Sequence, residues 1–360
     1  MNQNSLIINQ GYMSDGMILD PLAMRPYIDP RTGLSYVASV KGIKQNADGT
    51  QTPVLAPRRV YQNALLRLRD WELIDAEVLD VMRQPLVGVS DLLGAGLTRP
   101  LGGIGVSITT YEQISDMTDA TVSMSVNPKK GENDQVEFSP VSIPVPIISK
   151  PFFLDIRTLD ASRRNGHEGL DTTQIRVATR KVREQMESML FNGSSIVVDT
   201  YHIYGYRNHP RRITDTAANF GGGDFATAKN GHNTLVGMIK ALQADGFYGP
   251  YGAYVSRNQY SELLRLQGDG SAAQTELEVI LRTIPDLKFV KMAPSLPDGE
   301  CEVIQLTKEV VDYAIGMDVT PVSWQDFGGL INEFRVMAAA VARIKYDANN
   351  QCGVAHATGC

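Results

Sequence analysis

The sequence of 360 residues contains few of the patterns that reveal chemistry. Its three cysteines, Cys301, Cys352 and Cys360, include no CxxC pair, so they indicate neither a zinc motif nor a disulfide framework. This cysteine usage fits a reducing compartment best. The formal net charge is -6, from 34 basic and 40 acidic residues, which is not the clustered basic excess of a nucleic-acid-binding protein.

Long apolar runs are missing as well. The most apolar run, "VMAAAVA" at residues 336–342, is far too short to cross a bilayer. The first residues lack the basic segment and apolar run of a secretory signal. We therefore expect a protein that is soluble and intracellular when it is made, with no membrane partner.

Catalytic and ligand-binding motifs are also missing. The five histidines include no i, i+4 pair, and His202 and His209 flank a tyrosine-rich loop in which a packing role is the simpler interpretation. The glycine-rich residues 94–105 have neither the order GxGxxG nor GxxxxGK[ST], so tight turns explain them better than a phosphate loop. We predict no enzyme activity, no cofactor and no metal. The acidic residues that cluster without the spacing of a calcium loop are Asp155, Asp160, Glu168 and Asp171.

Composition and apolar spacing predict an arm, a helix and a hairpin in the N-terminal part of the chain. Residues 1–57 are rich in Asn, Gln, Gly, Asp and Pro without a sustained period, which predicts an arm and not a domain. Two β-type segments around "NPKKGEND" predict a long hairpin. Because a two-stranded ribbon alone is marginal in water, we expect the hairpin to lie against another element or another copy. Apolar spacing predicts a helix over residues 62–82, with one face formed by Leu65, Leu68, Trp71, Ile74 and Val78.

A longer helix is predicted over residues 171–193. Asp171 is a good N-cap that pairs with Gln174, and Gly193 supplies the left-handed residue that ends a helix. About twenty residues give a rod of roughly 30 Å. Its apolar stripe is expected to pack on a sheet of the same chain and consists of Ile175, Ala178, Val182, Met186 and Met189.

From residue 229 the chain alternates helices and strands. A helix starting near Asn233 ends at Gly246, and the later helices open with the pairs Ser256/Gln259 and Thr275/Glu278, which predict capping boxes. The segment "LINEFRVMAAAVARIKY" has period two and predicts a long strand despite its alanines. The polar tail from Asp347 is expected to be frayed.

The order of these elements indicates an assembly protein. The arm and the hairpin both expose surface that a monomer would leave unsupported, so copies of the chain would supply one another's missing contacts. An intracellular α/β enzyme is the reading that this pattern favours least.

Three stretches carry a resemblance to a known family. They are "LRDWELIDAEVLDVMRQPLVGVSDLLGAGL", "VPIISKPFFLDIRTLDAS" with "VATRKVREQMESMLFNGSS", and "LVGMIKALQADGFYGPYGAYVSRNQYSELLRL". Over residues 58–345 the chain resembles the major capsid proteins of tailed bacteriophages with the Hong Kong 97-like fold, and more closely the branch shared with encapsulin shell proteins. The first stretch is similar to an early helix and a following apolar strand in encapsulins.

The resemblance implies an α+β Hong Kong 97-like capsid fold with an N-arm, an extended hairpin loop, a spine helix, a peripheral β-sheet domain and an axial α/β domain. The implied divisions are 1–57 N-terminal arm, 58–109 helix and strand of the peripheral domain, 110–156 hairpin loop, 157–228 spine helix and peripheral domain, 229–328 axial domain, 329–346 returning strand and 347–360 tail. The implied assembly contacts at the hairpin tip are Asn127, Pro128, Lys129, Lys130, Gly131 and Glu132, and the axial-domain turn is Gly249, Pro250 and Tyr251.

The function that the resemblance implies is structural. The first expectation is a major capsid protein that builds the icosahedral head of a tailed double-stranded DNA phage, assembled in the host bacterial cytoplasm and found in the virion capsid. Its partners would be itself in hexamers and pentamers, portal, decoration or scaffold proteins, and DNA packaged without sequence specificity. The alternative is an encapsulin-type compartment that encloses cargo protein. The long arm favours the phage head, and Lys129 and Lys130 alone do not establish an autocatalytic crosslink.

Overall fold

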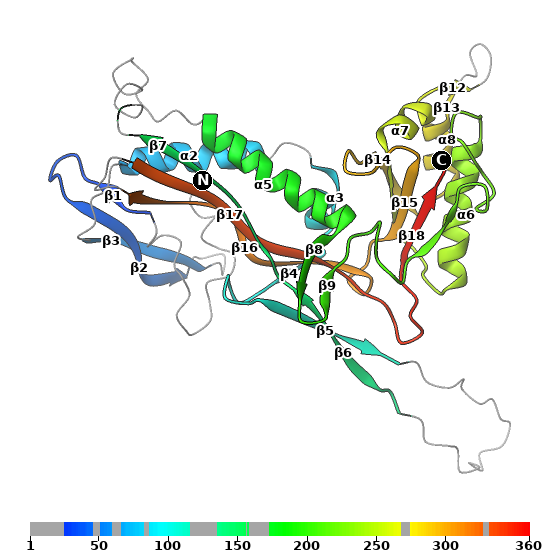
Figure 1. Ribbon diagram of the computed structural model, residues 1–360, viewed down its shortest axis with the longest axis horizontal. Coiled ribbons are helices and arrows are strands. Elements are labelled where there is room, and N and C mark those ends of the chain that lie inside the picture. The colour runs from blue at the N-terminus through cyan, green and yellow to red at the C-terminus, as the bar shows by residue number, and fades with distance from the viewer. Residues whose placement is uncertain are drawn as a thin grey trace.

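Two large β-sheets lie at opposite ends of an elongated molecule (Figure 1). The computed structural model describes residues 25–45, 51–59, 66–82, 86–115, 135–155, 157, 173–267, 274–326 and 331–360. One sheet has four strands in the order β4-β16-β17-β7, and the other has five in the order β10-β18-β15-β11-β14. We call them the peripheral sheet and the axial sheet, after the domains that the resemblance implies. None of the described helices is both long and apolar enough to cross a membrane.

The peripheral sheet is built around two long antiparallel strands, β16 (Val311–Asp326) and β17 (Ile331–Ile344). Strand β7 (Ile147–Asp155) pairs with β17, and β4 (Thr98–Pro100) runs parallel to β16. The predicted long strand is β17, and its period of two is visible as alternating buried and half-buried residues over 331–338. Every residue from 338 to 344 is buried, so both faces of the sheet are covered there.

Two helices lie along the peripheral sheet (Figure 1): the spine helix α5 (Thr173–Asn192) and α2 (Leu68–Met82). Gly193 has a φ of +71°, so the predicted left-handed end of the spine helix is confirmed. Leu68 was expected on the apolar face of α2 but is 50% exposed, because it lies on the first turn at the edge of the stripe. Asp171 and Leu65 lie outside the described residues.

The glycine-punctuated segment after α2 is a helix and not the strand that the resemblance implied. It forms α3 (Val87–Gly94). The amides of Gly88 and Val89 donate to the carboxylate of Glu187 on the spine helix, at 2.7 and 3.1 Å. A partner 98 and 99 residues away therefore satisfies the first turn of α3, and a local sequence pattern cannot show it.

The axial sheet pairs strands that are far apart in sequence. They are β10 (Ile213–Thr216), β11 (Tyr251–Val255), β14 (Leu287–Met292), β15 (Glu300–Gln305) and β18 (Val354–Thr358). Helices α6 (Asn230–Ala244), α7 (Arg257–Leu263) and α8 (Glu276–Thr283) flank it, and all three contribute to an apolar core with the sheet.

The two predicted capping boxes have different outcomes. Thr275 and Glu278 form the reciprocal pair at the start of α8, at 3.2 and 3.3 Å, so this prediction is confirmed. Ser256 is the N-cap of α7, but its hydroxyl bonds to the side chain of Gln259 and caps no backbone amide. The Gln259 oxygen instead accepts from the amide of Gly299, which ties α7 to the start of β15.

The expected frayed tail is wrong. Strand β18 pairs with β10 on one side and with β15 on the other, and its residues 354–357 are buried. The small and apolar side chains of β18 fit this interior position of the sheet, although the stretch from Asp347 to Gln351 is mostly polar. Three division boundaries also change. Strand β10 belongs to the axial sheet, and β16, expected in the axial domain, belongs to the peripheral sheet. Strand β7, expected in the hairpin loop, also belongs to the peripheral sheet.

The described residues also form four smaller sheets. Part of the expected arm forms a three-stranded sheet of β1 (Tyr27–Ile28), β2 (Ser35–Gln45) and β3 (Gln51–Arg59). The base of the expected hairpin is the pair β5 (Ile108–Ile114) and β6 (Phe138–Pro144), which points away from both large sheets (Figure 1). Its expected tip contacts lie outside the described residues. The two remaining pairs are β8 (Ser194–Val198) with β9 (Tyr201–Ile203), and β12 (Leu266–Gln267) with β13 (Gln274–Thr275).

Candidate assembly elements and the junction between the sheets

The spine helix lies with one face on the peripheral sheet. Ile175, Ala178 and Val182 are buried in a core that includes Phe334 and Val336 of β17. Met189 is also buried, but it packs in a second core at the other end of the helix. Met186 is half-buried and packs against the first core and against a third core that includes Val89 and Leu92 of α3. The outer face is charged and carries exposed pairs such as Arg180 with Glu184 at 3.5 Å. A helix fixed along its length in this way acts as a rigid beam.

The spine helix, α3 and the axial sheet meet in one shared core. The Phe191 ring makes edge contacts with the rings of Tyr206 and Tyr254, at 5.7 and 5.2 Å between centroids. Gly88 of α3 lies against the helix so closely that an added Cβ would be 2.7 Å from the Leu190 side chain. Burial raises the pKa of Glu187, and the hydrogen bonds from the α3 amides oppose that rise. Close packing and a buried cap therefore fix α3 on the spine.

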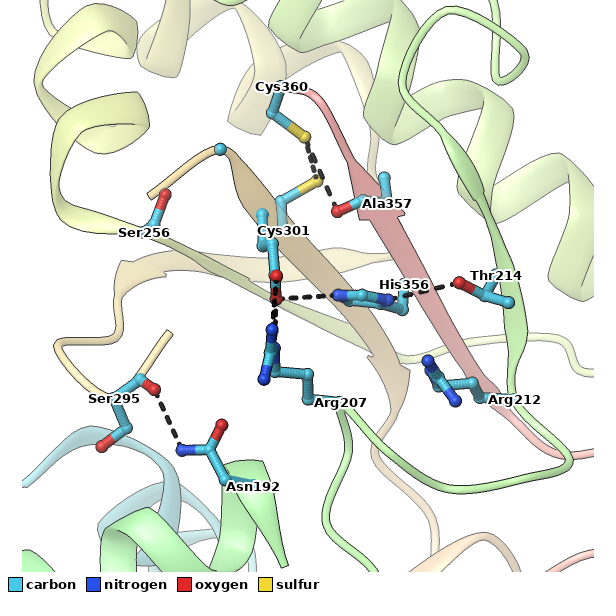
Figure 2. A network of polar contacts seen from close by, with 12 residues as sticks. Asn192, Arg207, Arg212, Thr214, Ser256, Ser295, Cys301, His356, Ala357 and Cys360 are labelled. Atoms are coloured by element: carbon cyan, nitrogen blue, oxygen red, sulfur yellow. Dashed lines mark hydrogen bonds and ion pairs between the residues drawn. The ribbon is translucent and has the colours of Figure 1, made fainter. Parts of the chain in front are cut away.

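Polar bonds tie the same junction to the axial sheet. Asp91 of α3 accepts from Lys291 of β14 at 2.5 Å and from the Tyr254 hydroxyl of β11 at 3.1 Å. Asn192, the last residue of the spine helix, donates to the carbonyl of Ser295 at 3.1 Å (Figure 2). The two large sheets thus share apolar and polar contacts and hold a fixed relative angle.

A buried arginine anchors the root of the hairpin. Arg343 of β17 has no exposed surface, and its guanidinium forms a bidentate pair with Asp312 of β16, at 2.6 and 2.5 Å. It also donates to the carbonyl of Thr110 at 3.0 Å and the hydroxyl of Thr109 at 3.3 Å, both on β5. Burial opposes ionisation of Asp312, but the bonds from Arg343 and Lys345 outweigh it and lower the pKa of Asp312.

A row of rings packs beside this anchor. It runs from Tyr111 of β5 through Tyr346, His209 and Tyr204 to His202, with centroid distances of 5.5 to 6.4 Å. Burial, helped by Arg212 and Arg211, lowers the pKa of His209 to about 4. His209 is therefore a neutral packing residue at pH 7, while His202 at the end of the row is exposed. The rings line a cleft of about 400 Å³ under the hairpin.

Large apolar side chains are exposed on the hairpin and beside it. Phe138 of β6 is 60% exposed, and Ile147 at the start of β7 is 53% exposed. The neighbouring β8 adds Ile196, Val197 and Val198. A monomeric protein rarely exposes so many large apolar groups on adjoining elements, so this surface favours contact with other chains.

Polar side chains of the axial sheet and of the loop before β10 form a hydrogen-bonded network centred on Glu300 (Figure 2). Glu300 accepts two bonds from Arg207, at 2.6 and 2.8 Å, and lies 3.0 Å from His356 on β18. Burial lowers the pKa of His356, so this imidazole is neutral at pH 7. The buried carboxyl of Glu302 has no hydrogen-bond partner among the described residues, and burial raises its pKa well above the ordinary value. On the other side of the His356 ring, the Thr214 hydroxyl of β10 lies 3.3 Å from the second nitrogen of His356, so the imidazole links three strands of the axial sheet (Figure 2).

The expected axial turn lies at the start of β11. The peptide bond between Gly249 and Pro250 is cis, and Tyr251 is fully buried with its hydroxyl donating to the Phe247 carbonyl at 2.5 Å. Next to it, Tyr248 is strongly exposed.

Comparison with known proteins places the chain. A family model described as a family of unknown function, DUF6260, matches residues 62–357. The chain belongs to the DUF6260 family. The Type 1 encapsulin shell protein EncA of Myxococcus xanthus (strain DK1622) is 25% identical over 285 residues, which is 78% of the DUF6260 chain and 91% of EncA.

Solved structures identify the fold of the DUF6260 chain. The virus-like particle from Pyrococcus furiosus matches with a TM-score of 0.56 at 17% identity, over 80% of the chain and 98% of the particle protein. The capsid of Myoviridae phage XM1 matches with a TM-score of 0.52 at 13% identity, over 77% and 94%. The predicted α+β Hong Kong 97-like fold is therefore confirmed. Shell proteins with this fold are structural proteins and not enzymes.

Sequence reasoning did not single out Arg343 and Glu187, two buried charges that hold the hairpin root and α3 in place in the DUF6260 chain. Each lies off the apolar face that the periodicity of its element predicts, so the pattern does not indicate its burial. The signal that could have found Arg343 is the pair of Asp312 and Lys345, which lie near it across two neighbouring long strands.

Proposed function

We propose that this chain is the subunit of a closed icosahedral protein shell and that it assembles with copies of itself. The observation that carries the proposal is the hairpin β5–β6, which projects from the body yet is anchored by a fully buried arginine. A buried charge is costly unless it is well paired, and Arg343 is paired with Asp312 and bonded to β5 at once, so the root of this projecting element is held specifically by the body. Such an element is useful where it reaches a neighbouring chain.

The mechanism of assembly is polyvalent association. The shared core at the junction keeps the two large sheets at a fixed angle, so each subunit presents its surfaces in one geometry. The projecting hairpin, the exposed apolar groups beside it and the β1–β3 sheet would each contact a neighbour. Many weak contacts per copy then add up to a stable shell, since every contact after the first is made at high effective concentration.

For the contents of the shell, we propose a compartment that encloses protein cargo. The support is the similarity to an encapsulin shell protein over nearly the whole length of that relative. The second candidate is the head of a tailed phage, which encloses double-stranded DNA. A phage capsid of the same fold supports it, and so does the β1–β3 sheet, which precedes the residues matched by the family model.

Purification of the assembled product tests both levels of the proposal. Light scattering and electron microscopy are expected to show closed particles, and a stable monomer or dimer at physiological salt would refute the shell. The ratio of absorbance at 260 and 280 nm, followed by nuclease treatment, gels and mass spectrometry, distinguishes the contents. Genome-length DNA inside the particle would favour the phage head, and a co-purified protein without DNA would favour the compartment.

A deletion tests the role of the hairpin. Replacing residues 116–134, which join β5 to β6, with a short Gly-Ser turn should leave a folded subunit that does not close shells. The matched control shortens residues 268–273, which join β12 to β13 on the axial unit. Normal particles from the hairpin variant would contradict the proposed contact between neighbours.

A further inference from the structure

Two cysteine side chains face each other inside the axial unit. The Sγ atoms of Cys301 on β15 and Cys360, just beyond β18, are 3.4 Å apart (Figure 2). Cys301 is fully buried and Cys360 keeps 6% of its surface exposed. The Met238 sulfur lies 3.6 Å from that of Cys301, so an apolar, polarisable environment surrounds the pair. The third cysteine, Cys352, is fully buried in the separate core at the junction.

The backbone holds both cysteines in place. Cys301 is directly opposite Ala357 in the antiparallel pair β15–β18, and the amide of Cys360 donates to the carbonyl of Gly299 at 3.0 Å. Hydrogen bonds on both sides of the pair therefore keep the two thiols adjacent. A disulfide bond is about 2.0 Å long, so a rotation of the side chains with little backbone movement brings the sulfurs together.

We propose that Cys301 and Cys360 form a reversible disulfide when the protein passes from reducing to oxidising surroundings. The oxidant is a low-molecular-weight disulfide such as oxidised glutathione. The Cys360 thiolate attacks one sulfur of the oxidant and releases one glutathione thiolate, which leaves a mixed disulfide on Cys360. The Cys301 thiolate then attacks the Cys360 sulfur and releases the second glutathione. The two cysteines lose two electrons to the oxidant and two protons in total.

The order of the steps follows from exposure. Cys360 is the less buried of the two residues, while the hydrogen bond with Cys360 and burial raise the pKa of Cys301 well above the usual range. Cys301 is therefore a poor first nucleophile for an oxidant in solution. It attacks the mixed disulfide within the protein, where the sulfur is already in contact with it.

The disulfide bond would close a loop that contains the two long strands of the peripheral sheet. After β15 the chain leaves the axial sheet, runs through the paired strands β16 and β17 of the peripheral sheet, and returns to form β18. A Cys301–Cys360 bond joins the two ends of this excursion, which are 59 residues apart in sequence. Oxidation would thus stabilise the axial and peripheral units together, chiefly by restricting the unfolded chain. This inference does not depend on what the shell contains or on whether it closes.

Thiol counting on the folded protein tests the proposal. Wild type, Cys352→Ser and Cys360→Ser are incubated with oxidised glutathione, unfolded in acid, and titrated with a thiol reagent. We expect two thiols to be lost from wild type and from Cys352→Ser, and a peptide map with Cys301 joined to Cys360. Cys360→Ser should keep both of its remaining thiols. The denaturation midpoint of wild type and of Cys352→Ser should rise on oxidation and return on reduction.

Three results would overturn the proposal. Folded wild type could keep all three thiols after equilibration with the oxidant, the map could show a bond that includes Cys352, or the midpoint of oxidised wild type could stay unchanged. If Cys360→Ser does not fold, Cys301→Ala replaces it, and this variant should carry glutathione on Cys360 without an internal bond. A glutathione adduct that also persists on wild-type Cys360 would refute the second step.

Discussion

Replacing Arg343 with methionine removes the guanidinium at the hairpin root and keeps an unbranched side chain about as long as the aliphatic part of arginine. The guanidinium loses its bidentate pair with Asp312 and both bonds to β5. Removing one partner of a buried ion pair costs about 3–5 kcal/mol. Because Lys345 still lies 2.8 Å from Asp312, we expect a loss of about 3 kcal/mol, at the lower end of that range.

Guanidinium denaturation followed by tryptophan fluorescence measures this loss, with all variants at equal chain concentration because association shifts the midpoint. The control is Arg180→Met on the exposed face of the spine helix, where a single surface pair with Glu184 should change the free energy of unfolding by less than about 0.5 kcal/mol. Asp312→Leu with Arg343→Met should be more stable than Arg343→Met alone, because no buried carboxylate remains in the double variant.

The pH dependence gives a second check with a defined sign. The pKa of Asp312 is lowered in the folded protein, so its stabilisation is complete above the ordinary value of 3.8 and is lost as the pH falls through the folded value. The difference between wild type and Arg343→Met should therefore shrink as the pH falls below 3.8. A loss under about 1 kcal/mol at neutral pH, or a difference that grows in acid, would refute the anchoring role.

Three further predictions concern the spine helix, α3 and the ring row. Val182→Asp should prevent folding, as seen by circular dichroism, because an unpaired charge in a core is costly, whereas Val177→Asp on the 43% exposed face should fold. Gly88→Ala should cost about 1–3 kcal/mol in denaturant unfolding because its Cβ would meet Leu190, whereas Gly94→Ala, whose Cβ meets nothing within 4 Å, should be neutral or stabilising. The pKa of His209 falls from 6.5 to about 4 on folding, so stability should decline as the pH drops through that interval, and less so in His209→Phe.

The sequence predicts two kinds of element well. One kind is covered on one face by the same neighbours along its length, and the other is determined by residues close in sequence. Strand β17 keeps its period of two because the spine helix and α2 cover one face of the sheet evenly up to residue 338. The spine helix ends where Gly193 permits a left-handed backbone, and Thr275 and Glu278 cap α8 through bonds within four residues. These features depend on local geometry, so a single sequence contains them.

The features that the sequence does not predict depend on distant partners. The second face of β17 near Arg343 is covered by the hairpin root, where Ile143 and Val145 pack against Ala339 and Val341, so the expected polar phase is buried. Strand β18 is short and follows the mostly polar stretch from Asp347 to Gln351, and it forms a strand because β10 and β15 pair with it on either side. The start of α3 is likewise set by Glu187. Contacts between segments that are far apart in the sequence produce no periodic pattern of apolar residues in either segment, so a single sequence does not reveal them.

The position of β18 has a consequence for synthesis on the ribosome. Translation releases β10 and β15 long before residues 354–358 exist, so during most of synthesis the strand that joins β10 to the rest of the axial sheet is missing. A nascent chain therefore has an incomplete axial unit until its latest strand arrives. Subunits would become competent to join others after translation has passed this strand, which keeps neighbouring nascent chains on one messenger from associating too early.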